Sequence, residues 1–453
     1  MKERPPQKNK KENSMKKNKK FYLKCTLCGF KVESFAQWFE SAQRCPECGS
    51  NQADVIYNEK KSHLRDLIDS KFSQPVGLWY YFDFLPLNKK DNIITAGEGI
   101  VPIDRWHFME RYARDRHNID CQVYAHRHDD NYATGTFKDL AGSVVASVLK
   151  ETGIRNYVVS STGNIGVAYS RYLTAAGASL YAFIPQNSSH SQEAEIGCFG
   201  QKVFRVAGDY TRAKEMALEF SQKFDFPLAA GNFDPMRIEA KKTMVYEWLR
   251  LLKDFPTVYI QALSGGTGPL GIVKGCNELD KLDLFKSIPR FIMVQSGKCR
   301  PMADAWRTAK ANEFPEGWEK SYPIYHDPET MIPTLATGYP KTYPVLAPLV
   351  RESGGEIISY EESKTPNVAR LVAYESSVRI GPAAAIAVGG YFKSLEEGHI
   401  RNGDIVLLNI GEGIRRSPDF LERLIYTTTS VSSIDECMTF DRKKLREQDW
   451  FTV

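Results

Sequence analysis

The chain has 453 residues, of which 42% are hydrophobic and 25% are charged, a balance typical of a globular protein with two or three domains. Its formal charge of +5 is concentrated in residues 1–20, which hold nine Lys and Arg against two Glu, so the other 433 residues sum to about −2. We therefore interpret residues 1–20 as a disordered basic tail, and we exclude a general nucleic-acid-binding surface on the rest of the chain.

The sequence contains no apolar run long enough to cross a bilayer, and no apolar segment follows the basic tail as it would in a signal peptide. A cytoplasmic protein with no membrane partner is therefore expected. Its nine cysteines should then stay reduced rather than form disulfides. A role of the tail on RNA or on a membrane surface is the open alternative.

Two Cys-x-x-Cys pairs lie near the N-terminus, and each is followed by a glycine, which accepts the backbone angles of a tight turn. Their spacing predicts that residues 21–55 form a zinc-ribbon-like element whose Zn²⁺ is bound by Cys25, Cys28, Cys45 and Cys48. Four thiolates leave no open coordination position, so this metal would be structural. Two disulfides or four unliganded thiols are the alternatives.

Short apolar strands alternate with helical segments from about residue 120 onward. The predicted strands are Gln122–His126, Tyr157–Ser160, Leu180–Pro185, Val203–Val206, Val258–Ala262, Phe291–Gln295 and Asp404–Asn409. Helical periodicity is found, for example, in Leu140–Glu151, Val167–Ala176, Arg212–Phe224 and Arg237–Lys253. The alternation predicts an α/β fold with a mostly parallel sheet covered on both faces, in which ligands bind at the carboxyl ends of the strands.

Lys138 follows the loop Thr134–Phe137 at the start of a predicted helix. A lysine in this place can be partly desolvated, and the positive end of the helix dipole also lowers its pKa. The neutral amine that is favoured in this way can form a Schiff base with an aldehyde. A solvated lysine in the first turn of a helix is the ordinary alternative.

A second loop, Ser161-Thr162-Gly163-Asn164, lies where strand Tyr157–Ser160 turns into the next helix. Successive backbone N–H groups at a helix start bind anions, so Ser161, Thr162 and Gly163 are candidates for holding a substrate carboxylate. The amide of Asn164 can donate to a phenolic oxygen on a cofactor ring. An ordinary helix N-cap is the alternative for the serines.

A third loop follows strand Val258–Ala262 and contains Gly265, Gly266, Thr267 and Gly268. Its backbone N–H groups predict a phosphate cradle, although a tight structural turn is the alternative. The loop matches neither the Walker A pattern nor G-x-G-x-x-G, so a nucleotide is not the preferred ligand. An amine, a carboxylate site with a ring partner and a phosphate cradle together predict pyridoxal phosphate (PLP) acting on an amino acid.

These motifs resemble those of the fold-type II PLP-dependent enzymes, specifically the threonine synthase and cysteate synthase group. The run Thr134–Asp139 is similar to the family's Schiff-base motif, with Ala133 where the family has proline. Ser161–Asn164 resembles its asparagine loop, and Gly265–Gly268 resembles its phosphate loop. Further similarity lies at Gly77–Tyr81, Leu85–Pro86, Gly97–Ile103 and Thr334–Pro340.

The resemblance implies a two-lobed, tryptophan synthase β-like catalytic unit over residues 56–453, with PLP held between the lobes as an internal aldimine on Lys138. Lys138, once displaced by the substrate, would abstract the α-proton, and a β- or γ-leaving group, commonly phosphate, would be replaced by a nucleophile. Ser161–Gly163 would hold the substrate carboxylate, Asn164 the ring oxygen and Gly265–Gly268 the cofactor phosphate. A homodimer is the family expectation.

The chain departs from the family's pattern at two places. Ile100-Val101 stands where threonine synthases have Asn-Thr, which argues against recognition of phosphohomoserine. Ile410 stands where the family has a Ser or Thr facing the pyridine nitrogen, so Asn409 or no side chain takes that role. Pro301–Trp306 and Leu407–Ile410 are more similar to cysteate synthases, which replace the phosphate of O-phosphoserine with sulfite.

We therefore expect β-replacement on an activated amino acid such as O-phospho-L-serine. The first alternative is a threonine synthase acting on O-phosphohomoserine. The second is a PLP-binding regulatory protein without activity, against which the intact Lys138 and the asparagine loop argue. Candidate cations for an oxyanionic group, of which the spacing singles out none, are His126, Arg127, His128, Lys298, Arg300 and Arg415.

Overall fold

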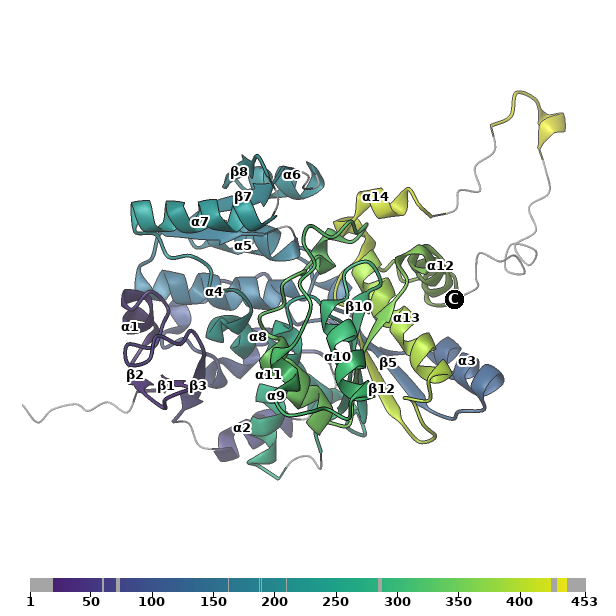
Figure 1. The fold of residues 1–453 in the computed structure, drawn as a ribbon, viewed down its shortest axis with the longest axis horizontal. Coiled ribbons are helices and arrows are strands. Elements are labelled where there is room, and N and C mark those ends of the chain that lie inside the picture. Colours follow the sequence, from purple (N-terminus) through teal and green to yellow (C-terminus); the bar gives the residue numbers. More distant parts are fainter. Residues whose placement is uncertain are drawn as a thin grey trace, which may run out of the picture.

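The computed structural model describes residues 19–58, 61–70, 74–161, 163–186, 188, 190–208, 210–283, 287–424 and 430–437. These residues contain a six-stranded sheet and two three-stranded sheets (Figure 1). The predicted basic tail, residues 1–20, lies outside the described residues except for its last two positions. Among the helices of this part of the chain, none is both long and apolar enough to cross a membrane.

The six-stranded sheet has the strand order β11-β10-β9-β12-β5-β4. Its strands are β4 (Ile103–Arg105), β5 (Gln122–His126), β9 (Val258–Ala262), β10 (Arg290–Ser296), β11 (Glu356–Tyr360) and β12 (Ile405–Asn409). All neighbours pair in parallel except the edge strand β4, which runs antiparallel to β5. The mostly parallel α/β sheet expected from the sequence is therefore confirmed.

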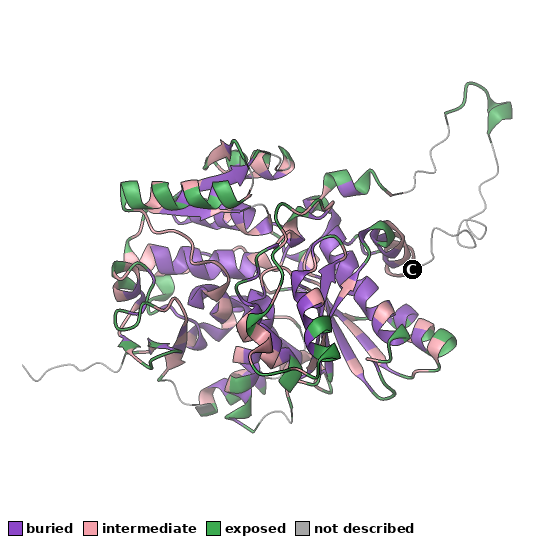
Figure 2. Ribbon diagram, viewed as in Figure 1, coloured by how far each residue is buried: buried purple, intermediate pink, exposed green. Residues whose placement is uncertain are grey.

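Each face of this sheet has its own core, because successive side chains of a strand point to opposite faces. On β12, Val406 and Leu408 belong to one core, whereas Leu407 belongs to the other. The first core is covered by α3 (His107–His117), α12 (Thr365–Ser376) and α13 (Pro382–Glu396). The second is covered by α8 (Pro235–Leu251), α9 (Thr267–Asp280), α10 (Pro301–Ala311) and α11 (Tyr343–Glu352). Both faces are consequently buried, as Figure 2 shows.

The second sheet is parallel, with the order β6-β7-β8, and lies apart from the large sheet, at the upper left of Figure 1. Its strands are β6 (Asn156–Ser160), β7 (Ser179–Pro185) and β8 (Lys202–Val206). The helices of this region are α4 (Lys138–Thr152), α5 (Asn164–Ala175), α6 (His190–Cys198) and α7 (Tyr210–Phe224). Since α4 contacts both α5 and α8, it joins this layer to the large sheet.

The third sheet, β2-β1-β3, belongs to the N-terminal element. Its elements are β1 (Phe21–Cys25), β2 (Lys31–Val32), α1 (Phe35–Glu40) and β3 (Ala53–Tyr57). The side chains of Leu23, Val32, Trp38 and Val55 are buried, and they share one continuous core with α4 and α8. The element is therefore packed onto the body. The remaining helices are α2 (Lys61–Ile68) and α14 (Pro418–Leu421).

Ion pairs and a hydrogen bond also link the N-terminal element to α8 and α9. The Lys274 ammonium on α9 lies 2.5 Å from an Asp54 carboxylate oxygen on β3. The Tyr57 hydroxyl on β3 donates to Glu239 on α8 (2.6 Å), and Glu239 is also paired with Lys242 (2.5 Å). This buried network ties β3 to the two helices that flank the predicted phosphate loop.

Candidate active site and metal site

The predicted site residues lie at strand ends, as the fold requires for a ligand site. Lys138 is the first residue of α4, Asn164 is the first residue of α5 and Gly266 directly precedes α9. Asn409 is the last residue of β12. Glu412, in the loop after β12, bonds to Asn164 and lies close enough to Lys138 to influence its charge, so residues from both parallel sheets meet here.

The Lys138 amine is neutral in about half of the molecules at pH 7. Burial is the largest cause and the positive charge of Arg237 is the second, and together they lower the pKa of Lys138 to about 7 against a smaller opposing effect of Glu412. The Nζ atom lies 4.1 Å from the centre of the Phe137 ring. The direction and its largest cause, burial, agree with the expectation, whereas the contribution of Arg237 was not foreseen. A neutral amine is the form that attacks an aldehyde.

Hydrogen bonds to Asp139 fix the loop that precedes Lys138. The Thr134 hydroxyl donates to one carboxylate oxygen of Asp139 (2.6 Å), and the Thr134 backbone N–H donates to the other (2.9 Å). Gly135 has a φ of +70°, and a side chain there would overlap the Arg415 guanidinium. The loop therefore needs glycine at this position, and it holds Lys138 in one place.

The Asn164 side chain is oriented by residues that follow β12. Its Nδ2 donates to Glu412 Oε2 (2.6 Å), while its Oδ1 accepts from Arg416 Nε (3.2 Å). Glu412 Oε1 in turn accepts from the backbone N–H of Ala383 (2.8 Å). Burial raises the pKa of Glu412 despite these hydrogen bonds. The amide of Asn164 is thus preorganised by a buried carboxyl group and a guanidinium.

The asparagine loop is stabilised by Ser161. Its Oγ accepts from the backbone N–H groups of Gly163 (3.2 Å) and Gly166 (3.3 Å) and donates to the Gly163 carbonyl (3.1 Å). These hydrogen bonds fix the loop locally, while the residue directly before α5 is Gly163, so substrate binding by Ser161 stays a prediction. Thr162 lies outside the described residues. A side chain at Gly163 would approach Thr334 to 3.2 Å, so the family-like segment Thr334–Pro340 lies against this loop.

The predicted phosphate loop is closely surrounded. Gly266 has a φ of +84°, and side chains at Gly265 and Gly268 would overlap Asn232 and Gln261, respectively. The Thr267 hydroxyl donates to Asn232 Oδ1 (3.0 Å). Within the described chain, no hydrogen-bond acceptor is found for the backbone N–H groups of Gly265, Gly266, Thr267 and Gly268. These donors are free to bind an anion at the start of α9.

Asn409, the candidate partner for the ring nitrogen, ends β12. It is 2% exposed, and neither its Oδ1 nor its Nδ2 has a hydrogen-bond partner among the described residues. The Tyr259 hydroxyl donates to Gln261 (2.7 Å), and it also lies near enough to Asn409 for the Asn409 side chain to lower its pKa slightly against the larger effect of burial. Ile410 is fully buried in the hydrophobic core, so it faces away from a cofactor. A buried amide without partners is costly unless a ligand satisfies it.

Four functional candidates were not singled out from the sequence: Arg237, Lys241, Glu412 and Arg416. Arg237 and Lys241 are charged residues one turn apart on α8, a pattern that is also typical of a solvated helix face. Glu412 lies within the Leu407–Gly413 run, next to the departure at Ile410, which is the only signal that pointed to it.

Several cations suggested by the sequence are already paired. Arg127 binds Asp129 (2.8 Å), and Arg300 lies 3.3 Å from Asp304. Arg415 donates to the backbone carbonyl of Asn131 (2.5 Å). These three side chains therefore serve the local structure.

The residues around Lys138 fit PLP. Lys138 has a pKa of about 7, which leaves about half of its amine neutral at pH 7; the glycine loop offers unused N–H donors, and Asn409 offers a buried amide. Lys138 would hold the aldehyde carbon, Asn164 the ring oxygen, Gly265–Gly268 the phosphate and Asn409 the ring nitrogen. PLP bound in this way would supply an electron sink for a carbanion at the substrate α-carbon.

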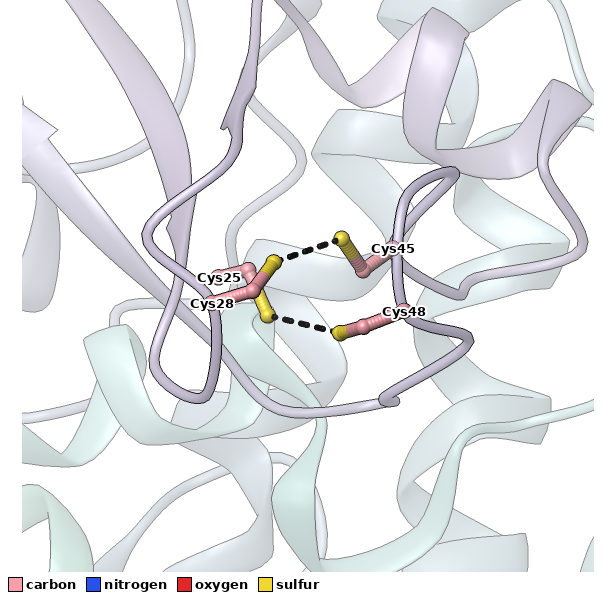
Figure 3. A group of neighbouring side chains, drawn as sticks. All are labelled: Cys25, Cys28, Cys45 and Cys48. Atoms are coloured by element: carbon pink, nitrogen blue, oxygen red, sulfur yellow. Dashed lines mark hydrogen bonds between the residues drawn. The ribbon is translucent and has the colours of Figure 1, made fainter.

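The four cysteines of the N-terminal element come together as predicted (Figure 3). All four sulfur atoms lie within 4.8 Å of one another, and the Cys25–Cys48 and Cys28–Cys45 Sγ distances are 3.6 and 3.5 Å. These separations are too long for disulfides. A tetrahedral site with Zn–S bonds of about 2.3 Å requires sulfur atoms about 3.8 Å apart, so the donor set fits zinc.

Comparison with known proteins places the chain in a family. The family model described as "Pyridoxal-phosphate dependent enzyme" matches residues 94–411. This range contains Lys138, Asn164, the phosphate loop and Asn409, and it covers well over half of the chain.

Similar proteins include a threonine synthase of Methanocaldococcus jannaschii, 24% identical over 83% of this chain and 93% of that protein. A cysteate synthase of Methanococcoides burtonii is 25% identical over 94% of this chain and 95% of that protein. The crystal structure of holo diaminopropionate ammonia lyase from Escherichia coli shares the fold, with a TM-score of 0.60 and 14% identity over 73% of this chain and 88% of that chain. The chain therefore belongs to the family of pyridoxal-phosphate-dependent enzymes, with relatives in the threonine synthase and cysteate synthase group.

Proposed function

We propose that this enzyme replaces the phosphate of an activated amino acid such as O-phospho-L-serine with a nucleophile, using PLP attached to Lys138. The observation that carries the proposal is the lysine with a pKa of about 7 between Arg237 and Glu412, at strand ends that also present the phosphate loop and Asn409. A threonine synthase activity on O-phosphohomoserine fits the relatives equally well.

The roles of the residues follow from their chemistry. Lys138 would hold the cofactor aldehyde through its Nζ, and the same amine, when free, would be placed to take the proton from the substrate α-carbon. The N–H groups at the start of α5, with Ser161, Thr162 and Gly163, would hold the substrate carboxylate. Glu412 and Arg416 keep the Asn164 amide in place, so the cofactor ring would be oriented without rearrangement of the protein.

Two features favour the serine derivative. Ile100 is 57% exposed and Val101 is 1% exposed, and neither side chain can hydrogen-bond to a distal phosphate. Arg237 places a positive charge beside Lys138, and we propose that it lies near the β-substituent of the bound substrate. A phosphate group that departs from the β-carbon would therefore leave next to a cation, which lowers the cost of its developing charge.

Phosphate release from two substrates tests the proposal. The holoenzyme is incubated separately with O-phospho-L-serine and O-phosphohomoserine, each with and without sulfite, and free phosphate is measured. We expect release from O-phosphoserine and a sulfonated amino acid when sulfite is present. Release from phosphohomoserine alone would overturn the proposal in favour of the threonine synthase activity.

The identity of the anchoring lysine is tested separately, because Lys241 is also buried in this region. Lys138→Ala should lose the visible absorbance of the covalently bound cofactor, and borohydride reduction of the wild type should mark the peptide that contains Lys138. Lys241→Gln should keep both signals. Marking of Lys241 instead would contradict the assignment.

We also propose that Cys25, Cys28, Cys45 and Cys48 bind a structural Zn²⁺ in residues 21–55, and that residues 56–453 form the two-lobed catalytic unit. The sulfur cluster and its packing on α8 support this division. Metal analysis should find about one zinc ion per chain, since four thiolates saturate one tetrahedral ion. A homodimer and a cytoplasmic location stay predictions.

A further inference from the structure

Helix α8 buries a second lysine without a partner. Lys241 is 0% exposed, and its Nζ has no hydrogen-bond partner among the described residues. Its stem is fixed, because α9 packs so closely that a side chain at Gly271 would meet the Lys241 Cβ at 2.6 Å. Its ammonium end lies 5.1 Å from the ring centre of Phe137, the residue before Lys138. Lys241 therefore points toward the same space as Lys138.

The next residue, Lys242, is a buried lysine that does have partners and can be compared with Lys241. Lys242 is equally buried, but its Nζ lies 2.5 Å from a Glu239 carboxylate oxygen and 3.0 Å from one of Glu278. Burying a lysine without such partners is costly. The contrast indicates that the missing partner of Lys241 is not a residue of the fold.

The charges that face Lys241 leave an excess of positive charge. Lys138 from α4 and Arg237 from α8 repel it, and Asp234 at the start of α8 attracts it. His128, from the turn at residues 128–130, is buried beside it and has an Nε2 without a partner. The Nε of Arg237 also has none among the described residues. Burial and the two cations lower the pKa of Lys241 well below its usual range.

We propose that Lys241 is a ligand for a tetrahedral oxyanion that binds beside Lys138, which makes it a residue that selects phosphorylated substrates. The inference rests on the proposed function and deepens it. A dianion would offset the repulsion from Lys138 and Arg237, so that Lys241 takes a proton from solvent and binds as an ammonium. Substrate phosphate and cofactor phosphate share this chemistry. The substrate is favoured because the glycine loop already offers N–H donors for the cofactor.

The experiment measures two affinities on the same proteins. Inorganic phosphate is titrated into the holoenzyme by calorimetry, and PLP is titrated into the apoenzyme by absorbance. The variants are Lys241→Gln, Lys241→Met and Lys241→Arg, with Lys253→Gln as the control, since Lys253 is an exposed lysine just beyond the end of α8. Thermal unfolding of each protein shows that it is folded. Lys241→Met replaces the amine with an apolar group of similar length, so it should fold at least as stably as the wild type.

We expect Lys241→Gln and Lys241→Met to weaken phosphate binding about 10- to 100-fold, the loss typical of a charge-assisted hydrogen bond. Affinity for PLP should stay unchanged, Lys241→Arg should retain most of the phosphate affinity, and Lys253→Gln should match the wild type. Unchanged phosphate affinity in both neutral variants would overturn the inference. A parallel loss of PLP affinity would also overturn it, because Lys241 would then serve the cofactor phosphate.

The substrate assay separates this inference from the proposed function. If the wild type releases phosphate from O-phosphoserine and Lys241→Gln does so with an unchanged KM, the proposed function stands and the inference fails. If phosphate binding depends on Lys241 but neither phosphorylated substrate reacts, the inference stands and the proposed function fails.

Discussion

Two charges of opposite sign act on Lys138, and removing them one at a time should move its pKa in opposite directions. Arg237 lowers the pKa and Glu412 raises it, with burial as the larger cause. Arg237→Gln should therefore raise the pKa of Lys138, and Glu412→Gln should lower it. The pair is informative because a general disturbance of the pocket would not produce shifts of opposite sign.

The size of the effect follows from the fraction of neutral amine. At pH 7 an ordinary lysine with a pKa of 10.5 is neutral in about one molecule in 3,000, whereas a pKa of about 7 makes about half of the molecules neutral. Removing a unit charge several ångströms away, with an effective dielectric constant of about 20, changes the free energy by at most about 3 kcal/mol, and we take about half of that, which is one pKa unit, for the prediction. At about one pH unit below the wild-type pKa, Arg237→Gln should attach PLP about tenfold more slowly, and Glu412→Gln should attach it severalfold faster.

The assay mixes apoenzyme with PLP on both sides of pH 7 and follows the visible absorbance of the covalently bound cofactor. The wild-type rate should rise about tenfold per pH unit up to about 7 and then level off. Glu412→Gln also disturbs the Asn164 amide, so the midpoint of the profile is compared rather than its plateau. Midpoints that move in the same direction, or do not move, would refute the electrostatic reasoning.

The same pKa makes the stability of the apoenzyme depend on pH. Lys138 has a pKa of about 7 in the folded apoenzyme, and the unfolded chain has the ordinary value of 10.5. Between these values the unfolded state binds more protons, so the apoenzyme should gain stability as the pH rises from about 7 toward 10.5. Lys138→Met should remove this gain, which denaturant unfolding of both proteins at several pH values would measure.

Three further changes test the fold around the two sites. Gly266 has a φ of +84°, so Gly266→Ala should weaken PLP binding about tenfold and destabilise the protein by about 1–2 kcal/mol. PLP titration and thermal unfolding would measure the two effects. Gly197→Ala is the control, because Gly197 lies in a helix with open space around it. Cys28→Ser should abolish zinc binding and lower the melting temperature, as metal analysis and calorimetry would show. Lys274→Met should lower the free energy of unfolding by about 3 kcal/mol, because it removes a cation that pairs with the buried Glu239 carboxylate. Urea unfolding should show a smaller loss at acid pH, where this carboxyl group is protonated.

Each of these predictions has a result that contradicts it. Full PLP affinity in Gly266→Ala would mean that the loop does not hold the cofactor phosphate. Retained zinc in Cys28→Ser would place the metal elsewhere. Unchanged stability in Lys274→Met would mean that the network between β3, α8 and α9 contributes nothing measurable.

The strands were predictable because each parallel strand is a short, mostly apolar run between helical segments. All seven predicted strands are present, with ends that differ by at most one residue. The strands that were not predicted include β4 and β11. β4 is the three-residue run Ile103–Arg105, which pairs on one side only and is not buried, so its sequence has no apolar run to recognise. β11 is a short edge strand that begins with Glu356.

The site was predictable only where a motif marks a strand end. Lys138, Asn164 and Asn409 could be placed because loops after parallel strands meet at one edge. Arg237 and Lys241 could not be placed in the site from the sequence. The packing of α8 against α4 and α9 decides which side of α8 faces Lys138. Likewise, Glu412 lies 248 positions from Asn164, so their hydrogen bond depends entirely on the tertiary fold.

Helix α8 contributes to both the active site and the cysteine element. Its Glu239 accepts a hydrogen bond from the Tyr57 hydroxyl of the cysteine element, and its Arg237 lies beside Lys138. Two binding equilibria that meet on one helix are reciprocal: whatever factor zinc contributes to the affinity for PLP, PLP must return to the affinity for zinc. A chelator that removes the proposed zinc ion would then weaken PLP binding by the same factor by which PLP strengthens zinc binding.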